Sequence, residues 1–356
     1  PEFAGEYPSS TIADEILTPG EGQIRAFVTV AGNPVLSSPN GGRLDEAFGG
    51  LDFMVSVDYY LNETTRHADV ILPPTAGLER SHYDLIFNMF AVRNTAKYSP
   101  ALFDAGKDAR HDWQILLELA HRLEKKRKGG RLPLRSEMGW RAFKQIGPDP
   151  ILDLMLRAGP YGTDIGPARG LVQPAIDLVM DILPERHPLR GLAKMSPLNR
   201  HWQDLPKGLS ISALKELPIG VDLGPLRPCI PGRLFPRDGK VNLAPRRYLQ
   251  DLGRLHALLT APASDGLLLI GRRHVRSNNS WMHNSQRLVK GKDRCTLMIH
   301  PKDAARCGLQ AGDSAEIGST SGQIVLPVEI TEDVMPGVVS VPHGWGHHRE
   351  GTGQSV

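Results

Sequence analysis

Short apolar runs alternate with helix-like polar segments in the first part of the chain. The apolar runs at residues 24–30, 51–58 and 68–74 are rich in Val, Ile and Phe, and the segments 42–50 and 62–67 separate them. The order strand, helix, strand, helix, strand at this spacing is typical of a parallel, doubly wound sheet. The runs are continuously apolar rather than alternating, which predicts strands covered on both faces.

The next part of the chain has the apolar spacing of a helix, and the region after it is harder to interpret. Residues 108–130 predict an amphipathic helix that stops near Gly129, and its basic tail is more typical of a solvated helix end than of a nucleic-acid patch. Beyond it, helical pieces alternate with Pro- and Gly-rich loops, up to an extended connector at 231–249. The predicted apolar face of the first helix consists of Trp113, Leu116, Leu117, Ala120 and Leu123. The later helical pieces are 139–146, 150–159, 175–183 and 211–217.

From Gly266 onward the pattern becomes that of β-structure. Residues 295–300 predict a strand, and Pro301 begins a short helix. In the run 321–331, Ile324, Leu326, Val328 and Ile330 alternate, which predicts that they face inward. Short strands separated by glycine turns suggest a small barrel.

Composition excludes several classes of protein. The 356 residues carry a net charge of +3, too small to indicate nucleic-acid binding, and no apolar run is long enough to span a bilayer. Only three cysteines occur, without a C-x-x-C pair, so neither a disulfide scaffold nor a zinc or iron–sulfur site is expected in these residues. A reducing, cytoplasmic setting fits this composition. Because the chain begins with Pro1 and ends without a terminating pattern, we interpret it as part of a longer protein.

Positive charge is concentrated in one segment. Between Arg272 and Arg294 there are seven Lys or Arg residues and one acid, Asp293. Such a segment requires a polyanion or several acidic partners. Single-stranded nucleic acid with Trp281 as a stacking platform is one alternative, but aromatic residues do not interleave with the basic ones.

Residues at the ends of two predicted strands suggest a nucleotide-binding site. The first predicted strand stops before Gly32, Asn33 and Pro34, and Asp58 ends the second, where ligands of open α/β sheets bind. Asp58 is equally well explained as a carboxylate for ribose or guanine and as a helix cap. The histidines of the terminal "HGWGHH" are more typical of a loop than of a metal site. No hydrolytic triad or carboxylate pair stands out, so we assign no catalytic residue and no metal ligand.

Several segments together resemble the C-terminal half of the molybdopterin oxidoreductases, the dimethyl sulfoxide reductase and formate dehydrogenase family. They are "VAGNP", "VSVDYYLNETTRHADVILPP", "RDGKVNLAP", "LIGRR" and the long run from "MIHPKDAARCG" to "VPHGW", in that order. The resemblance implies a bis-molybdopterin guanine dinucleotide cofactor with molybdenum or tungsten. It also implies an α/β plus β fold: a Rossmann-like domain at 1–130, a mostly helical interdomain region and connector at 131–264, and a dinucleotide-binding double-psi β-barrel, truncated at its C-terminus, at 265–356.

The resemblance also implies where the cofactor lies. Arg272, Arg273 and Arg276 would neutralise the pyrophosphates and pyranopterins, residues in the following loop would contact the pterin, and the first two strand ends would hold guanosine. We expect the strand at 267–271 to end at Gly271, so that at least one arginine faces the cleft. The predicted cofactor-binding residues are Gly32, Asn33, Pro34, Asp58, Thr64, Arg272, Arg273, Ser277, Asn278, His283 and Asn284.

The sequence departs from the family pattern in four respects. The N-terminal cysteine motif of cluster-containing members and the usual Cys, selenocysteine or Ser ligand of the metal are not in these residues. "LERSHYD" replaces the usual Glu followed by Gly-Thr or Gly-Ala, and the family's C-terminal tail is missing after Val356. An iron–sulfur cluster would therefore belong to the N-terminal part of the protein.

Two functions remain. The first is the cofactor-clamping portion of a two-electron oxidoreductase, formate-dehydrogenase-like and inactive alone, with a small-molecule substrate, the missing N-terminal half and an electron-transfer protein as partners. The second is a cofactor-free structural homologue that acts as a scaffold in an electron-transfer complex. The basic and polar cluster from Arg272 to Asn284 favours the first, because a scaffold has no need of that charge.

Overall fold

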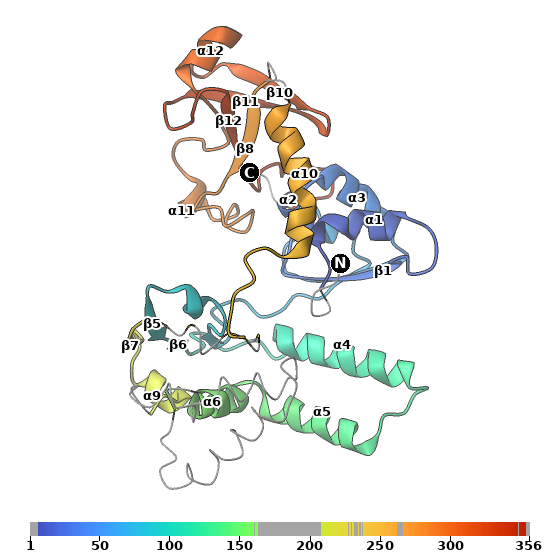
Figure 1. The fold of residues 1–356 in the computed structure, drawn as a ribbon. Coiled ribbons are helices and arrows are strands. Elements are labelled where there is room, and N and C mark those ends of the chain that lie inside the picture. The colour runs from blue at the N-terminus through green and yellow to red at the C-terminus, as the bar shows by residue number, and fades with distance from the viewer. Residues whose placement is uncertain are drawn as a thin grey trace. The chain divides into compact units, whose positions relative to one another are not determined.

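The structure is a computed structural model (Figure 1). It describes residues 6–159, 161–162, 208–226, 228, 230, 234, 236, 238–261, 266–347 and 349–353. By its internal contacts the chain divides into two units, Pro1–Pro74 with Ala261–Val356, and Thr75–Thr260. The unit boundary therefore lies at Pro74, whereas the sequence analysis placed a domain boundary at residue 130. The helical piece expected at 175–183 lies outside the described residues.

The first unit opens with the predicted parallel sheet. Its order is β1-β2-β3, and both pairings are parallel. The strands are β1 (Ala26–Val30), β2 (Phe53–Val57) and β3 (Val70–Ile71). The helices are η1 (Ser9–Thr11), α1 (Ile12–Leu17), α2 (Pro34–Ser37), α3 (Gly41–Gly49) and η2 (Thr65–His67).

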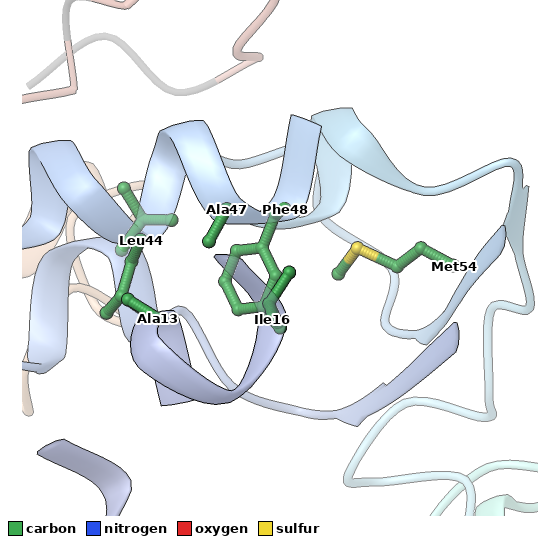
Figure 2. Close-up of a cluster of buried hydrophobic side chains, with 7 residues drawn as sticks. Ala13, Ile16, Leu44, Ala47, Phe48 and Met54 are labelled. Atoms are coloured by element: carbon green, nitrogen blue, oxygen red, sulfur yellow. The ribbon is translucent and has the colours of Figure 1, made fainter. Parts of the chain in front are cut away.

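Helices α1 and α3 pack together over this sheet around one apolar cluster. Figure 2 shows the side chains of Ala13 and Ile16 from α1 beside those of Leu44 and Phe48 from α3. The expectation of two covered faces holds for the central strand β2, which is buried from its second residue onward. It is wrong for the outer strands, because Val28, Val30 and Val70 are exposed in this chain.

The last part of the chain forms a second sheet in the same unit. Its order is β10-β11-β9-β12-β8, with β8 and β12 parallel, β9 and β11 parallel, and the other two pairings antiparallel. The strands are β8 (Leu268–Arg272), β9 (Leu297–Ile299), β10 (Ser314–Ser319), β11 (Gly322–Ile330) and β12 (Val338–Pro342), and the helices are α11 (Gln286–Val289) and α12 (Pro301–Cys307). The helix expected at Pro301 is confirmed, while the double-psi closure stays a prediction.

Two details of this sheet differ from the sequence analysis. Strand β8 ends at Arg272 rather than at Gly271, because its parallel pairing with β12 continues to the pair Arg272 and Pro342. Of the four residues expected to face inward in β11, Val328 is buried, but Ile324 is exposed near the hairpin end. The apolar core of this sheet consists of Leu297, Ile299, Ala304, Ala315, Val328 and Val339.

The second unit is built mainly from helices. They are η3 (Phe87–Phe90), α4 (Asp112–Arg127), α5 (Leu134–Ile146), α6 (Asp149–Ala158), α9 (Ile211–Lys215) and α10 (Arg246–Thr260). Two antiparallel pairs, β4 with β6 and β5 with β7, accompany them. Those strands are β4 (His82–Tyr83), β5 (Arg93–Ala96), β6 (Tyr98–Ser99) and β7 (Val221–Pro225).

The helix expected after residue 108 is confirmed as α4, but its buried face is not the predicted one. Ile115 is buried in α4, whereas Leu116 and Leu123 are exposed. The connector expected to be extended up to residue 249 is also partly helical, because α10 begins at Arg246 just after Pro245. Within the described residues, no helix has the length and apolar content needed to cross a membrane.

Candidate functional site

The loop after β1 places Asn33 among buried polar side chains. Its amide nitrogen donates to Glu63 Oε2 at 2.7 Å, and its amide oxygen accepts from the hydroxyl of Thr64 at 2.8 Å. The same hydroxyl accepts from the backbone N–H of Val35 at 3.2 Å. Asn33 and Thr64, both predicted as guanosine contacts, are therefore brought together, and both hydrogen-bond within the protein.

Asp58 lies at the end of β2, as the sequence analysis expected, but it does not cap the following helix. Its carboxylate accepts from the backbone N–H of Tyr60 at 3.0 Å and from the amide of Asn62 at 3.5 Å. Asn62 instead accepts from the first N–H groups of the η2 turn, those of Thr64 and Thr65, each at 3.0 Å. The capping alternative for Asp58 is therefore wrong, and its role toward guanosine stays a prediction.

A chain of buried hydrogen bonds joins this loop to the C-terminal segment. His347 Nδ1 lies 2.9 Å from Glu63 Oε1, and His347 Nε2 lies 2.8 Å from His283 Nδ1. The side chains of Glu63 and His347 are fully buried, and His283 is 0% exposed. Although burial raises the pKa of Glu63, the hydrogen bonds from His347 and Asn33 outweigh burial and lower that pKa. Residues 33, 63, 283 and 347 thus meet in one polar cluster, hereafter the Glu63 relay.

His283 ends the relay with an unsatisfied atom. Its ring lies against the indole of Trp345, with ring centroids 4.3 Å apart. His283 Nε2 and Trp345 Nε1 are buried and have no hydrogen-bond partner among the described residues. Burial is the main cause that lowers the pKa of His283 to about 4, so this imidazole is neutral near pH 7.

The loop from Arg273 to Ser285 carries the other predicted pterin contacts. Ser277 is buried, and its hydroxyl donates to the carbonyl of His274 at 3.0 Å, whereas Asn278 and Asn284 are exposed. The backbone of Asn278 adopts a left-handed conformation, with a φ of 42°. That conformation tolerates Asn better than most residues and turns the chain sharply. The loop therefore has a defined shape and presents polar side chains on its surface.

The three arginines of this segment divide into two kinds. Arg272 is half-buried and donates to the carbonyls of Ser340 and Thr296, at 2.6 and 2.8 Å. Burial lowers its pKa. Arg273 and Arg276 are exposed, and the charge of Arg273, after burial, lowers the pKa of His343. Arg272 thus ties β8 to its own sheet, and the two exposed arginines are better placed for an anion.

A cavity of about 750 Å³ lies beside the relay. Its lining includes Trp345 and His347, Ile324 and Leu326 of β11, and Cys295. Burial, and then Asp293, raise the pKa of the Cys295 thiol, so it is protonated near neutral pH. In the part of the chain that the structure describes, no group of three or more His, Cys, Asp or Glu could hold a metal.

The residues that organise this cluster were not predicted from the sequence. Glu63 lies inside a segment interpreted only as a helical turn, and His347 and Trp345 lie in the terminal loop that was considered for metal binding alone. One signal was available: a single carboxylate in "LNETTRH", flanked by amide and hydroxyl residues, is typical of a hydrogen-bonded interior position. Nothing in the sequence, however, indicates that its partner is 284 positions away.

Comparisons with known proteins agree with this layout. Residues 5–122 match the molybdopterin oxidoreductase family and residues 267–356 match the molybdopterin dinucleotide-binding domain. The chain is 26% identical to the dimethyl sulfoxide/trimethylamine N-oxide reductase of Rhodobacter capsulatus, over 88% of the chain and 35% of the relative. It is 33% identical to the assimilatory nitrate reductase catalytic subunit of Bacillus subtilis (strain 168), over 30% of the chain and 14% of the relative.

A solved structure supports the fold. Acetylene hydratase from Pelobacter acetylenicus superposes with a TM-score of 0.57 over 97% of this chain and 40% of its own, at 16% identity. The chain therefore spans less than half the length of the relatives that it matches along most of its sequence. The two matched regions lie toward opposite ends of the sequence, and the Glu63 relay joins the parts of them that belong to the first unit. This chain belongs to the molybdopterin oxidoreductase family.

Proposed function

We propose that this chain is the cofactor-clamping C-terminal portion of a bis-molybdopterin guanine dinucleotide oxidoreductase. The Glu63 relay carries this proposal, because it links residues of both family-matched regions through buried hydrogen bonds. A clamp requires this arrangement, in which the strand ends of the first sheet and the loop after β8 are held in one rigid frame.

The residues present fit such a cofactor. Two buried ring nitrogens, on His283 and Trp345, lack partners among the described residues, and a heterocycle edge would supply them. The exposed side chains of Arg273 and Arg276 suit pyrophosphate, because guanidinium groups form strong, forked hydrogen bonds to phosphate. When bound, the metal of the cofactor would exchange two electrons with the substrate. This chain would bind the organic part of the cofactor and exclude water from it.

The second sheet would supply the dinucleotide-binding wall. A double-psi β-barrel is consistent with its mixed order β10-β11-β9-β12-β8 and with the match of residues 267–356. A parallel pair on each side of β9 and β12, as observed, is compatible with that topology. Closure of the barrel is part of the proposal.

The substrate is a small molecule, and reduction is the favoured direction. The relatives include reductases of dimethyl sulfoxide, trimethylamine N-oxide and nitrate. A putative formate dehydrogenase of Bacillus subtilis is also similar, at 35% identity over 29% of this chain. We therefore propose two-electron reduction of an oxygen-bearing substrate, and retain the formate-dehydrogenase-like activity as the second candidate.

The remainder of the protein would be the main partner of this chain. Because the chain spans 35% of the Rhodobacter relative, most of a whole enzyme lies outside it. The exposed apolar residues Val28, Val30 and Val70 of the first sheet would be covered by that remainder. A metal ligand, an iron–sulfur cluster and the contact with an electron-transfer protein would also belong there.

Elemental and nucleotide analysis of the full-length protein tests the proposal. The purified protein should contain molybdenum or tungsten and release guanine nucleotide on acid hydrolysis, at about two nucleotides per metal. Absence of both from protein made in cells that synthesise the cofactor would favour the scaffold alternative. Turnover by the isolated chain would contradict the view that it is only a part of the catalytic unit.

A further inference from the structure

The hydrogen bonds of the Glu63 relay converge on the carboxylate of Glu63. Glu63 accepts from Asn33 Nδ2 at 2.7 Å and faces His347 Nδ1 at 2.9 Å. A carboxylate has no hydrogen to donate, so Nδ1 of His347 carries the hydrogen of that bond. We take His347 as a neutral imidazole, so that its second nitrogen is then an acceptor. The 2.8 Å bond between His347 Nε2 and His283 Nδ1 therefore takes its hydrogen from His283.

The same rule defines the last atom of the relay. A neutral His283 with its hydrogen on Nδ1 has a lone pair on Nε2, and this atom is buried without a partner among the described residues. Trp345 Nε1, on the ring tilted against His283, is also buried and unpartnered there, and an indole N–H only donates. The two rings thus offer one acceptor and one donor. A cyclic amide, in which an N–H lies next to a C=O, has the complementary pair.

We propose that Glu63, acting through His347, holds His283 in the tautomer whose Nε2 accepts a hydrogen bond from the cyclic amide edge of a bound pterin or guanine. Trp345 Nε1 donates to the oxygen of the same edge. In this arrangement Glu63 and His347 are positioning residues, and His283 and Trp345 touch the ligand. The inference rests on the proposed function, since it names the contact that this chain makes with the organic part of the cofactor.

Glutamine has nearly the size of Glu63, but it reverses the direction of the hydrogen bonds from residue 63 through His347 to His283. Thr64 fixes the amide of Asn33 by donating to its oxygen at 2.8 Å, so the NH2 of Asn33 continues to face residue 63. Glutamine must then turn its oxygen to Asn33 and its NH2 to His347. His347 Nδ1 becomes an acceptor and Nε2 a donor, and His283 carries its hydrogen on Nε2. Two donors then face the ligand, and the acceptor for its N–H is lost.

The first measurement is cofactor content in the full-length protein. In the E63Q variant, molybdenum and guanine nucleotide retained after dialysis should fall about tenfold, the loss expected for one buried hydrogen bond replaced by a donor–donor contact. The conservative variant E63D keeps the carboxylate and should retain more cofactor than E63Q. The control D45N removes a different carboxylate, which binds Arg349 near the same segment at 2.6 Å without touching His347, and should retain the wild-type content.

A second measurement reads the tautomers directly. With ¹⁵N-labelled histidine in the full-length protein, Nε2 of His283 should be unprotonated in the wild type and protonated in E63Q. The His283 signals are assigned by their loss in H283Q. An imidazolium His347 in the wild type, with both nitrogens protonated, would overturn the proposal, and so would an unchanged His283 tautomer in E63Q.

Ligand titration of the cofactor-free protein distinguishes whether a pterin or a guanine ring occupies the site. Neopterin serves as a free pterin and GMP as a free guanine nucleotide, and the ring whose binding is weakened by E63Q but not by D45N occupies the site. If neither binding is weakened, the proposal is wrong. If the wild type and the E63Q variant both carry full cofactor, this inference alone is contradicted. If the wild type contains neither metal nor guanine nucleotide, the proposed function is contradicted.

Discussion

The two units of the chain bury different kinds of side chain. The first unit buries a carboxylate and two histidines, Glu63, His283 and His347, in contact with one another. The second unit has a small apolar core around Tyr98 and Leu214, and its long helices α4, α5 and α10 leave leucines such as Leu123 and Leu255 exposed. Polar burial requires exact partners, whereas apolar burial requires only complementary shape. The first unit is therefore where single polar substitutions should have large effects, and the second unit is where most helix substitutions should be tolerated.

The largest difference in stability is expected between substitutions of apolar residues in the two units. Phe48→Ala should lower the free energy of unfolding by about 4 kcal/mol, because it removes an aromatic ring from the cluster of α1 and α3. Leu123→Ala on α4 should have almost no effect, since Leu123 is already exposed in this chain. Urea unfolding of the two variants measures the difference. A large loss in Leu123→Ala would show that another part of the protein covers α4.

Removal of the Glu63 carboxylate should be nearly as damaging. Glu63→Ala leaves the buried donors of Asn33 and His347 without their acceptor, and an unsatisfied buried donor costs roughly 1–3 kcal/mol. The matched control is Asp251→Ala on α10, which removes only an exposed ion pair with Arg254 and should leave stability unchanged. Equal midpoints of denaturation for the two variants would contradict the difference between the units.

Acidification should also act mainly on the first unit. The pKa of His283 is lowered to about 4 by burial, whereas an exposed histidine titrates near 6.5, so the unfolded chain binds more protons between these values. Stability should therefore fall by up to about 3 kcal/mol as pH decreases from 6.5 to 4. Glu63, whose pKa is lowered, acts in the same direction as pH decreases further. Unfolding midpoints measured across this pH range should depend less on pH in H283Q, and an unchanged pH dependence would argue against a neutral, buried His283.

The smallest effect is expected at Asp58. Asp58→Ala should lower stability by about 1 kcal/mol, because the carboxylate accepts from the N–H of Tyr60 in the turn after β2. If Asp58 also holds guanosine, the full-length variant should in addition lose cofactor, measured as guanine nucleotide per protein. Full cofactor content with the small loss of stability would limit Asp58 to its turn.

Much of the fold could be predicted because its signals are local. The apolar runs of β1, β2 and β3, with the intervening helical segments, predicted a parallel sheet, and Pro301 marked the start of α12. The buried face of α4 could not be predicted in the same way, because periodicity shows that a helix has an apolar side but not which residues a neighbour covers. Strand β8 likewise gains Arg272 from its pairing with β12, a partner about 70 positions away.

The sequence by itself determined the family, the order of the elements and the segment from which His283 projects. Each of these depends on residues close together in the chain or on motifs in a given order. Only the tertiary structure decided that Asn33, Glu63, His283 and His347 form one relay, and that Arg272 donates to backbone carbonyls while Arg273 is exposed. The reason is physical: a buried polar side chain must be satisfied by a partner in space. That partner is set by the packing of segments that lie about 200 or more residues apart in the sequence.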